Sequence, residues 1–253
     1  MCTAVILRRP GHAWPLLLAA NRDEMIDRPW LPPGRHWPDR PETVAGQDTL
    51  SGGSWLGVND HGVVAAVLNR TGSLGPQAGK RSRGELVLDA LDHADARAAA
   101  EALSEIDPHA FRSFNLVIAD DRDAYWLSAR NGALSVALHT VPEGVSIITS
   151  QDLNEENALR TRTFLPKFRA APAPDPETGD WKAWEDLLAT RREGASAPFD
   201  DTMCIVTDRG YGTVSSSLIA LPRLEPGAKT LWRFSAGRPD ITPFESVLPE
   251  HQD

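Results

Sequence analysis

The amino-terminal region consists of two short apolar segments separated by turn-forming residues. Residues 4–7 and 15–20 are the apolar segments, and Arg-Arg-Pro-Gly-His stands between them. Proline and glycine interrupt regular structure, so this pattern predicts a β-hairpin that turns near Pro10 and Gly11. A second hairpin is predicted from residues 54–59 and 63–68, which Asp-His-Gly joins. The proline-rich residues 28–41 between the two hairpins are predicted to be irregular.

Helical periodicity appears in two parts of the chain. Ser82 and Glu85 have the spacing of a capping box, and the apolar residues that follow predict a helix over residues 83–93. A second helix is predicted over 96–106, and a third over 154–168. A fourth, amphipathic helix carries Trp181, Trp184, Leu187 and Leu188 on one face, which we interpret as core residues.

Further strands are predicted where apolar runs lie between Asp-rich, Asn-Gly and Pro-Glu-Gly turns. Four of them follow one another as an antiparallel meander: residues 114–119, 124–128, 134–138 and 145–149. Three more are predicted near the end of the chain: residues 202–207, 212–221 and 230–234.

The order of these elements is strands, two helices, strands, two helices, strands. Because antiparallel hairpins dominate, we expect an α+β protein in which helices cover two antiparallel sheets, as a four-layer α-β-β-α sandwich. The proline-rich residues 171–176 are interpreted as a surface loop, because the later strands cannot easily form an independent unit. We therefore predict one domain over residues 1–253.

Composition excludes several classes of function. The net charge of −9 and the lack of a basic stripe argue against a nucleic-acid partner. Apolar runs are too short for a membrane span, and Pro10 and Gly11 break the stretch after Arg8 and Arg9 that superficially resembles a twin-arginine signal. We therefore expect a cytoplasmic protein whose partner is a small-molecule substrate or ligand; its oligomeric state is not predicted.

The two cysteines do not imply a disulfide framework, and the seven histidines have no metal-binding spacing. We expect neither a cofactor nor a structural metal. Cys204 lies in an apolar run and is expected to be a buried thiol. Cys2 differs, because a small second residue normally permits removal of Met1. Cys2 would then carry both a thiol and a free α-amine, which can act as general base for its own nucleophile.

The predicted hairpin makes this arrangement chemically interesting. A turn near Gly11 pairs residues whose numbers sum to about 22, which puts Cys2 opposite Ala20 and near the Asn-Arg-Asp-Glu segment. Arg22 would favour the thiolate and lower the thiol pKa, while Asp23 can accept a hydrogen bond from the ammonium or orient Arg22. The same four residues are equally typical of a solvated strand end.

A second group of residues surrounds the second hairpin. Gly-Gly-Ser-Trp-Leu-Gly-Val-Asn covers residues 52–59, and glycines there permit close backbone approach. Asn69 ends the second strand of this hairpin, where its side-chain amide can donate to an oxyanion. An asparagine that simply ends a strand before Thr-Gly fits the pattern as well.

Together, Cys2, the Asn-Arg-Asp-Glu segment, the glycine-rich run, Leu68-Asn69-Arg70 and Tyr211-Gly212-Thr213 resemble the NRDE family, also called the transport and Golgi organisation family. That family resembles the N-terminal nucleophile hydrolases, especially the choloylglycine hydrolase and penicillin V acylase branch. The resemblance implies an α-β-β-α sandwich with a cysteine nucleophile.

The resemblance also implies site residues. The implied catalytic residues are Cys2, Arg22, Asp23 and Asn69, and the candidate substrate-binding residues are Asn21, Trp55 and Asn154. Two departures stand out. The hydrolase branch has asparagines after the strand that here ends at Thr149, whereas this chain has Ser150-Gln151-Asp152, with Asn154 as a displaced substitute. The NRDE pattern Tyr-Gly-Thr-Arg-Ser-Ser has Val214 at its arginine position.

Three functions follow from these observations. The first is hydrolysis of a linear amide C–N bond through Cys2. The second is a non-catalytic binding or carrier role, because the resemblance also implies links to haem mobilisation and to acyl-lipid or coenzyme A handling. The third is a structural or interaction module that keeps Cys2 only as a small residue.

Overall fold

The computed structural model describes residues 2–191, 201–225 and 227–247. The chain divides into two compact units. Unit 1 contains residues 1–27, 143–149 and 153–253, and unit 2 contains residues 28–142 and 150–152. Each unit is built on one antiparallel sheet with a pair of helices, which confirms the predicted α+β class with two antiparallel sheets.

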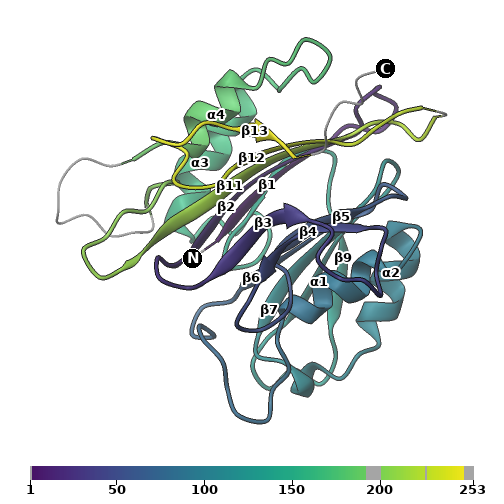
Figure 1. Cartoon of the computed structure of the whole chain (residues 1–253), viewed down its shortest axis with the longest axis vertical. Coiled ribbons are helices and arrows are strands. Elements are labelled where there is room, and N and C mark those ends of the chain that lie inside the picture. The colour runs from purple at the N-terminus through teal and green to yellow at the C-terminus, as the bar shows by residue number, and fades with distance from the viewer. Residues whose placement is uncertain (1, 192–200, 226, 248–253) are drawn as a thin grey trace. The chain divides into compact units, whose positions relative to one another are not determined.

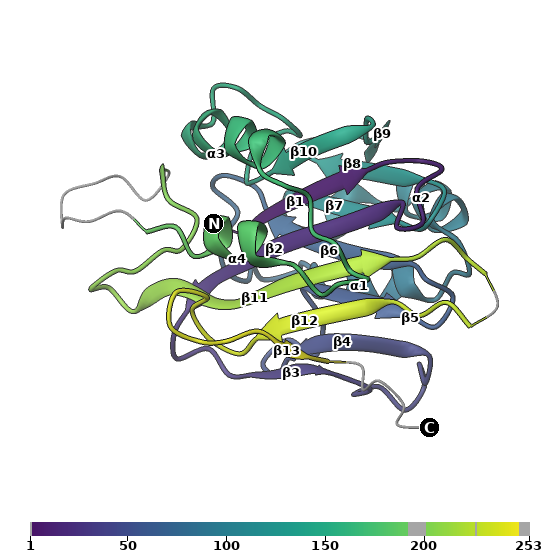
Figure 2. The ribbon, with the colours of Figure 1, turned by 90° about the horizontal axis from the view of Figure 1, so that it is seen from above.

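The sheet of unit 1 has six strands in the order β10-β1-β2-β11-β12-β13, and Figure 2 shows this order. Every neighbouring pair is antiparallel. The strands are β1 (Thr3–Arg8), β2 (Leu16–Met25), β10 (Gly144–Ile148), β11 (Tyr211–Leu221), β12 (Leu231–Ser235) and β13 (Glu245–Ser246). The central strands β2 and β11 are the longest. β2 includes the polar residues 21–24 that follow Ala20.

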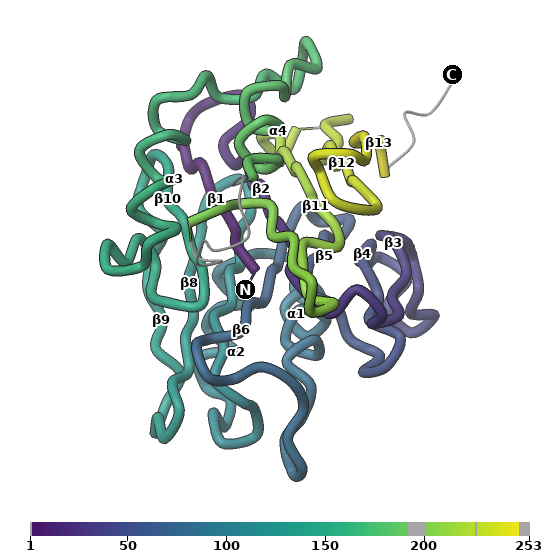
Figure 3. Tube along the Cα trace, turned by 90° about the vertical axis from the view of Figure 1, so that its left-hand side faces the viewer, coloured from purple at the N-terminus to yellow at the C-terminus, as the bar shows by residue number. Residues whose placement is uncertain are grey.

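Two helices pack on one face of this sheet (Figure 1): α3 (Leu159–Ala170) and α4 (Lys182–Leu188). Alternate residues of the strands, such as Val5 and Leu17, meet Phe164 and Trp184 in a continuous apolar cluster. Figure 3 shows α3 beside β10. The predicted interpretation of Trp181 and Trp184 as core residues is confirmed, since both are almost completely buried.

The predicted strand over residues 202–207 is wrong. Residues 202–205 of this segment are buried, whereas Val206 is 42% exposed, and the segment makes only an isolated bridge, between Val206 and Gly212. Its backbone N–H groups bond elsewhere: those of Met203 and Cys204 donate to the carbonyl oxygen of Thr190, and that of Ile205 donates to the Thr213 hydroxyl. Burial alone produced the strand-like pattern in the sequence.

The sheet of unit 2 is a seven-stranded meander in chain order, β3-β4-β5-β6-β7-β8-β9. All of its pairs are antiparallel. The strands are β3 (Trp30–Gly34), β4 (Thr43–Asp48), β5 (Leu56–Asn59), β6 (Val64–Asn69), β7 (Phe114–Ala119), β8 (Ala124–Ala129) and β9 (Ala137–Thr140).

Two predictions about this meander need correction. Residues 28–41 are not wholly irregular, because β3 forms the sheet edge there. Its pairing with β4 is interrupted between Leu31 and Gly34, which accommodates Pro32 and Pro33. The predicted fourth strand of the later meander, observed as β10, pairs with β1 in unit 1. The third strand is shifted to Ala137–Thr140.

The helices α1 (Gly84–Leu91) and α2 (Ala96–Ser104) cover one face of the unit 2 sheet. Their apolar sides pack on strands β6, β7 and β8 around Leu116 and Ile118. The predicted capping box is present in part: the carboxylate of Glu85 accepts the backbone N–H of Ser82 at 3.2 Å. A 3-10 turn, η1 (Pro108–Ala110), precedes β7.

The glycine-rich run of residues 52–59 joins α1 to this sheet. A Cβ atom on Gly53 would lie 2.6 Å from the carbonyl carbon of Gly84, so only glycine permits this backbone approach. A Cβ atom on Gly57 would meet Leu91 of α1 at 2.7 Å. The run therefore has a packing role in unit 2.

Candidate functional site

Cys2 immediately precedes β1, and the register of the β1–β2 hairpin decides which residues lie near it. Thr3 pairs with Asn21 and Ala4 with Ala20, so the predicted pairing of Cys2 with Ala20 is wrong. Continuing the observed register puts position 2 opposite Arg22. The error is two residues, which keeps every side chain on its predicted face. Met1, whose removal the nucleophile hypothesis requires, lies outside the described residues.

The thiol of Cys2 is half-buried and contacts the end of β2. Its Sγ donates to the backbone carbonyl oxygen of Asp23 at 3.7 Å. Burial raises the pKa of the Cys2 thiol, and the charge of Asp23 adds to this, while the amino terminus and Arg22 act in the opposite direction. The expected lowering by Arg22 is therefore present but is outweighed by burial. In this environment the thiol is neutral near pH 7.

Asp23 has a fully buried carboxylate held by two side chains. Its Oδ1 accepts from the hydroxyl of Thr213 at 2.6 Å, and its Oδ2 accepts from the Arg160 guanidinium at 3.3 Å. Thr213 comes from β11, where it pairs with Asp23, and Arg160 comes from the first turn of α3. Neither residue was predicted as an Asp23 partner. Nothing in the spacing of Arg160 distinguishes it from an ordinary helix residue.

Arg22 and Asn21 lie on the same strand, and both are buried. Arg22 pairs with Ser215 of β11. The amide of Asn21 donates to the carbonyl oxygens of Leu188 and Met203, each at 3.0 Å, and accepts from Ser216 at 2.6 Å. Asn21 therefore ties the end of α4 and the 202–205 segment to the sheet.

Val214 occupies an irregular position in β11. The register with β2 shifts between Thr213 and Ser215, so Val214 is the extra residue of a β-bulge. Bulges redirect side chains and are frequent beside active sites. This is the position where the NRDE pattern has arginine.

Asn154 holds the edge strand β10. Its backbone has a positive φ of 57°, its N–H donates to the carbonyl oxygen of Ile147, and its Oδ1 accepts the N–H of Ile147, both at 2.8 Å. Its amide nitrogen donates to Ser146 at 3.1 Å. The side chain is thus engaged in extending the sheet edge, a use of asparagine that suits its tolerance of left-handed backbone.

Within unit 2, Asn69 ends β6 and is half-exposed. Among the hydrogen bonds of the described residues, none uses its side-chain amide. The next residue, Arg70, is buried and donates to Asn115 at 2.5 Å and to Asp152 at 2.6 Å. The end of β6 is therefore fixed while the Asn69 amide stays uncommitted.

Residues 150–152 are hydrogen-bonded near the end of β6. The N–H of Thr71 donates to the carbonyl oxygen of Ser150 at 3.1 Å, and the Gln151 amide donates to the Thr71 hydroxyl at 3.0 Å. Asp152 also pairs with Arg130. Burial acts to raise the pKa of Asp152, but Arg70 and Arg130 lower it overall.

Trp55, the remaining candidate substrate-binding residue, belongs to the glycine-rich run of unit 2. Its ring lies against Gly46, where a Cβ atom would approach it to 2.3 Å. It also meets Trp30 edge to face, with ring centroids 5.8 Å apart. These contacts fix the indole on strands β3 and β4.

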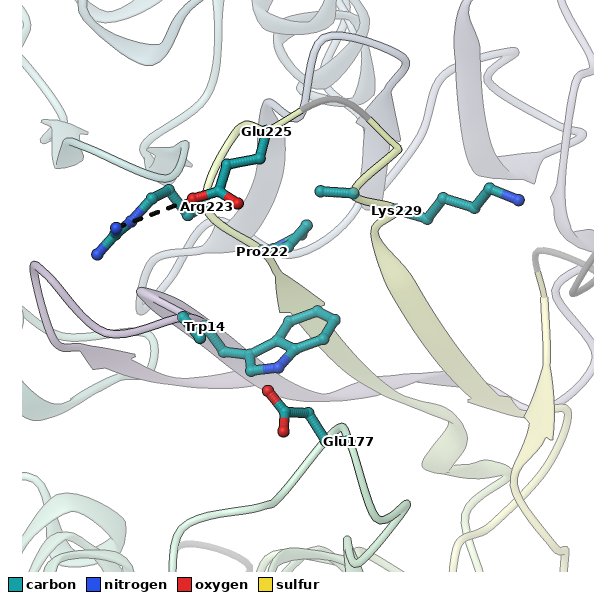
Figure 4. A pocket seen from close by; sticks show the side chains of 8 residues that line it. Trp14, Glu177, Pro222, Arg223, Glu225 and Lys229 are labelled. Carbon is teal, nitrogen blue, oxygen red and sulfur yellow. Dashed lines mark ion pairs between the residues drawn. The ribbon is translucent and has the colours of Figure 1, made fainter.

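A pocket of about 330 Å³ opens elsewhere in unit 1, where the β1–β2 loop meets the end of β11. Figure 4 shows the Trp14 indole in this pocket together with Glu177, Pro222 and Lys229. β1 separates this end of the sheet from Cys2, so the pocket is not part of the Cys2 surroundings. In the described part of the chain, no cluster of His, Cys, Asp or Glu side chains has metal-binding geometry, and no helix has the length and apolarity for a membrane crossing.

Several solved structures are similar to this chain in fold. Penicillin V acylase from Agrobacterium tumefaciens is 16% identical, with a TM-score of 0.59 over 93% of this chain and 83% of that protein. A Caenorhabditis elegans N-acylethanolamine-hydrolyzing acid amidase ortholog is also 16% identical, with a TM-score of 0.57 over 90% and 95%. Conjugated bile acid hydrolase from Clostridium perfringens, as the C2A mutant, is 12% identical, with a TM-score of 0.52 over 99% and 97%. These similarities confirm the predicted fold class.

Curated relatives share sequence with part of the chain. The Transport and Golgi organization protein 2 homolog of Bos taurus is 35% identical over 127 residues, which cover 48% of this chain and 42% of the relative. The human homolog is 36% identical over 115 residues, which cover 43% and 40%. The match thus spans less than half the length of these relatives. The family model described as Transport and Golgi organisation 2 matches residues 1–223, so the chain belongs to the Transport and Golgi organisation 2 family.

Proposed function

We propose that the chain hydrolyses a linear amide C–N bond, with Cys2 as its first residue and its nucleophile. One observation carries the proposal. The Cys2 thiol contacts the backbone of Asp23, whose buried carboxylate is fixed on both oxygens by Thr213 and Arg160. A strand end that merely met solvent would not need a buried carboxylate with two charged or polar partners.

Because the pKa of the Cys2 thiol is raised, the thiol is neutral when the first step begins. A neutral thiol must lose its proton as it attacks, and the α-amine of a processed Cys2 is a base on the same residue. Sγ bonds to the carbonyl carbon of the substrate while the amine takes the thiol proton. The carboxylate of Asp23 then holds the resulting ammonium in place.

The remaining steps need an oxyanion donor and a water molecule. The oxyanion donor proposed from the sequence is the Asn69 amide, which belongs to unit 2 and makes no hydrogen bond among the described residues. Collapse of the tetrahedral intermediate breaks the C–N bond, and the ammonium returns its proton to the departing amine. Water then attacks the thioester, releases the carboxylic acid and restores the Cys2 thiol.

The names of the structurally similar proteins suggest the first substrates to test. They designate a penicillin V acylase, an N-acylethanolamine-hydrolyzing amidase and a conjugated bile acid hydrolase. The test panel is accordingly penicillin V, an N-acylethanolamine and a glycine-conjugated bile acid, with release of the free amine as the measurement.

Intact mass and two matched variants test the proposal. We expect the purified chain to lack Met1, Cys2→Ala to abolish amine release and the acyl-adduct mass, and Cys204→Ala to retain both. A retained Met1, or unchanged turnover by Cys2→Ala, would reject the hydrolase. Saturable binding of haem or acyl-coenzyme A without turnover would instead support the carrier role.

A further inference from the structure

Arg160 is an almost completely buried cation outside the predicted set of site residues. It is the second residue of α3 and is 2% exposed. One of its terminal nitrogens, Nη1, donates to the Thr3 hydroxyl at 2.6 Å and to Oδ2 of Asp23 at 3.3 Å. Burying a guanidinium is costly unless its position is well compensated, so both contacts must be well maintained.

The two partners of Arg160 lie on either side of Cys2. Thr3 follows Cys2 in the chain and begins β1, where it pairs with Asn21. Asp23 offers its backbone carbonyl oxygen to the Cys2 thiol. A single nitrogen of Arg160 therefore links the start of β1 to the Asp23 segment of β2, and these two segments hold the Cys2 backbone and thiol.

The contribution of Arg160 is geometric. Charges that act on the Cys2 thiol include those of the amino terminus, Asp23 and Arg22. Arg160 contacts Asp23 and Thr3, the two residues that lie beside Cys2. These contacts give Arg160 a route by which its position affects Cys2 chemistry.

We propose that Arg160 is a positioning residue for the Cys2 centre, holding the Asp23 carboxylate where it binds the α-ammonium of processed Cys2. This inference rests on the proposed function. It adds that loss of the Arg160–Asp23 contact reduces the rate of the chemical steps while substrate affinity is kept, because the contacts of Arg160 are with Asp23 and Thr3 beside the nucleophile.

The kinetic test compares Arg160→Met with Arg160→Lys and with Arg233→Met. Arg233 is a matched control, because it pairs with Glu185 in the same unit but away from Cys2. We expect Arg160→Met to lower kcat about 100-fold with KM unchanged, as misplacement of about 1 Å does. Lysine should restore part of kcat, and Arg233→Met should match the wild type. Equal kcat in Arg160→Met and wild type would overturn the inference.

A second measurement does not depend on turnover. The pH profile of thiazolidine formation between the Cys2 aminothiol and formaldehyde, followed by peptide mapping, reports how strongly Asp23 holds the ammonium. We expect Asp23→Asn and Arg160→Met to shift this profile in the same direction, toward a more acidic amine, with circular dichroism unchanged. If only Asp23→Asn shifts the pH profile, Arg160 is not the positioning residue, and the proposed hydrolase activity is not contradicted. If turnover persists in Cys2→Ala, the proposed function fails and this inference fails with it.

Discussion

The hydroxyl of Thr213 donates to Oδ1 of Asp23 at 2.6 Å and accepts the backbone N–H of Ile205 at 2.8 Å. One side chain thus joins the buried carboxylate beside Cys2 to the 202–205 segment. Both partners are polar groups inside the protein, so removing the hydroxyl leaves each with a lost hydrogen bond.

Thr213→Val should therefore reduce the free energy of unfolding by about 1–3 kcal/mol, measured by urea titration. Thr161→Val is the matched control, since the Thr161 hydroxyl is equally buried and has no hydrogen-bond partner among the described residues. That control should change stability little. Equal losses in the two variants would show that threonine packing, and not the Asp23 contact, matters at position 213.

Asn21→Ala should destabilise the protein strongly. It deprives the carbonyl oxygens of Leu188 and Met203 of their donor and leaves the Ser216 hydroxyl without its acceptor. We expect a loss of about 2–5 kcal/mol in the free energy of unfolding. The exposed Asn157, whose amide bonds only to Glu155, provides the control Asn157→Ala. Unchanged stability with weaker substrate binding would support the substrate-binding role predicted for Asn21.

The sequence contains enough local information for the hairpins and most helices, but not for the details that build the site. The β1–β2 loop is longer than a turn at Pro10 and Gly11 requires, since the N–H of Arg9 bonds to the carbonyl oxygen of Pro15. Loop length fixes register, and this difference moved the partner of position 2 from Ala20 to Arg22. The alternation of side chains between the two faces of the sheet was unaffected by this difference.

The sequence pattern could not predict hydrogen-bond partners that lie far apart in the chain. Arg160 is 157 residues from Thr3 and 137 from Asp23 in the chain. Neither periodicity nor capping depends on such distant residues, so nothing marked Arg160 within its predicted helix. The proximity of Cys2 and Asp23 was accessible to prediction because both residues lie at the ends of one hairpin.

Cys204 should make stability depend on pH in the alkaline range. Burial, with the charge and hydrogen bond of Asp240, raises the pKa of its thiol from the ordinary 9.0 to about 12. A raised folded-state pKa gives stability that is complete below pH 9 and is lost as pH rises toward 12. Unfolding free energies of wild type should thus fall between these pH values by up to about 1.4 kcal/mol per pH unit.

Cys204→Ser lacks this titration, so its stability should be flatter over the same pH range. In native protein at pH 8, iodoacetamide should modify Cys2 before Cys204, because the Cys204 thiol is buried and protonated. Peptide mapping after alkylation measures both sites. Preferential labelling of Cys204 in folded protein would contradict this account.

Gly53→Ala tests the close approach between the glycine-rich run and α1. The new methyl group would lie 2.6–2.7 Å from backbone atoms of Gly84, and backbone cannot move aside as a side chain can. We expect a thermal midpoint several degrees lower, corresponding to about 1–3 kcal/mol of overpacking. In Gly34→Ala the methyl group meets only the His36 ring, which can rotate away, so that variant should melt close to wild type.

Asp152 should give unit 2 an acid-sensitive contact beside Asn69. Arg70 and Arg130 hold the pKa of Asp152 below its usual range, so the stability it contributes is present above about pH 4 and is lost as pH falls further. Asp152→Asn removes this titration and should lower stability at pH 7, with the gap from wild type closing in acid. Urea titrations of both proteins from pH 7 to about pH 3 check the linkage, and a gap that stays constant over this range would mean that Asp152 acts there by packing and not by charge.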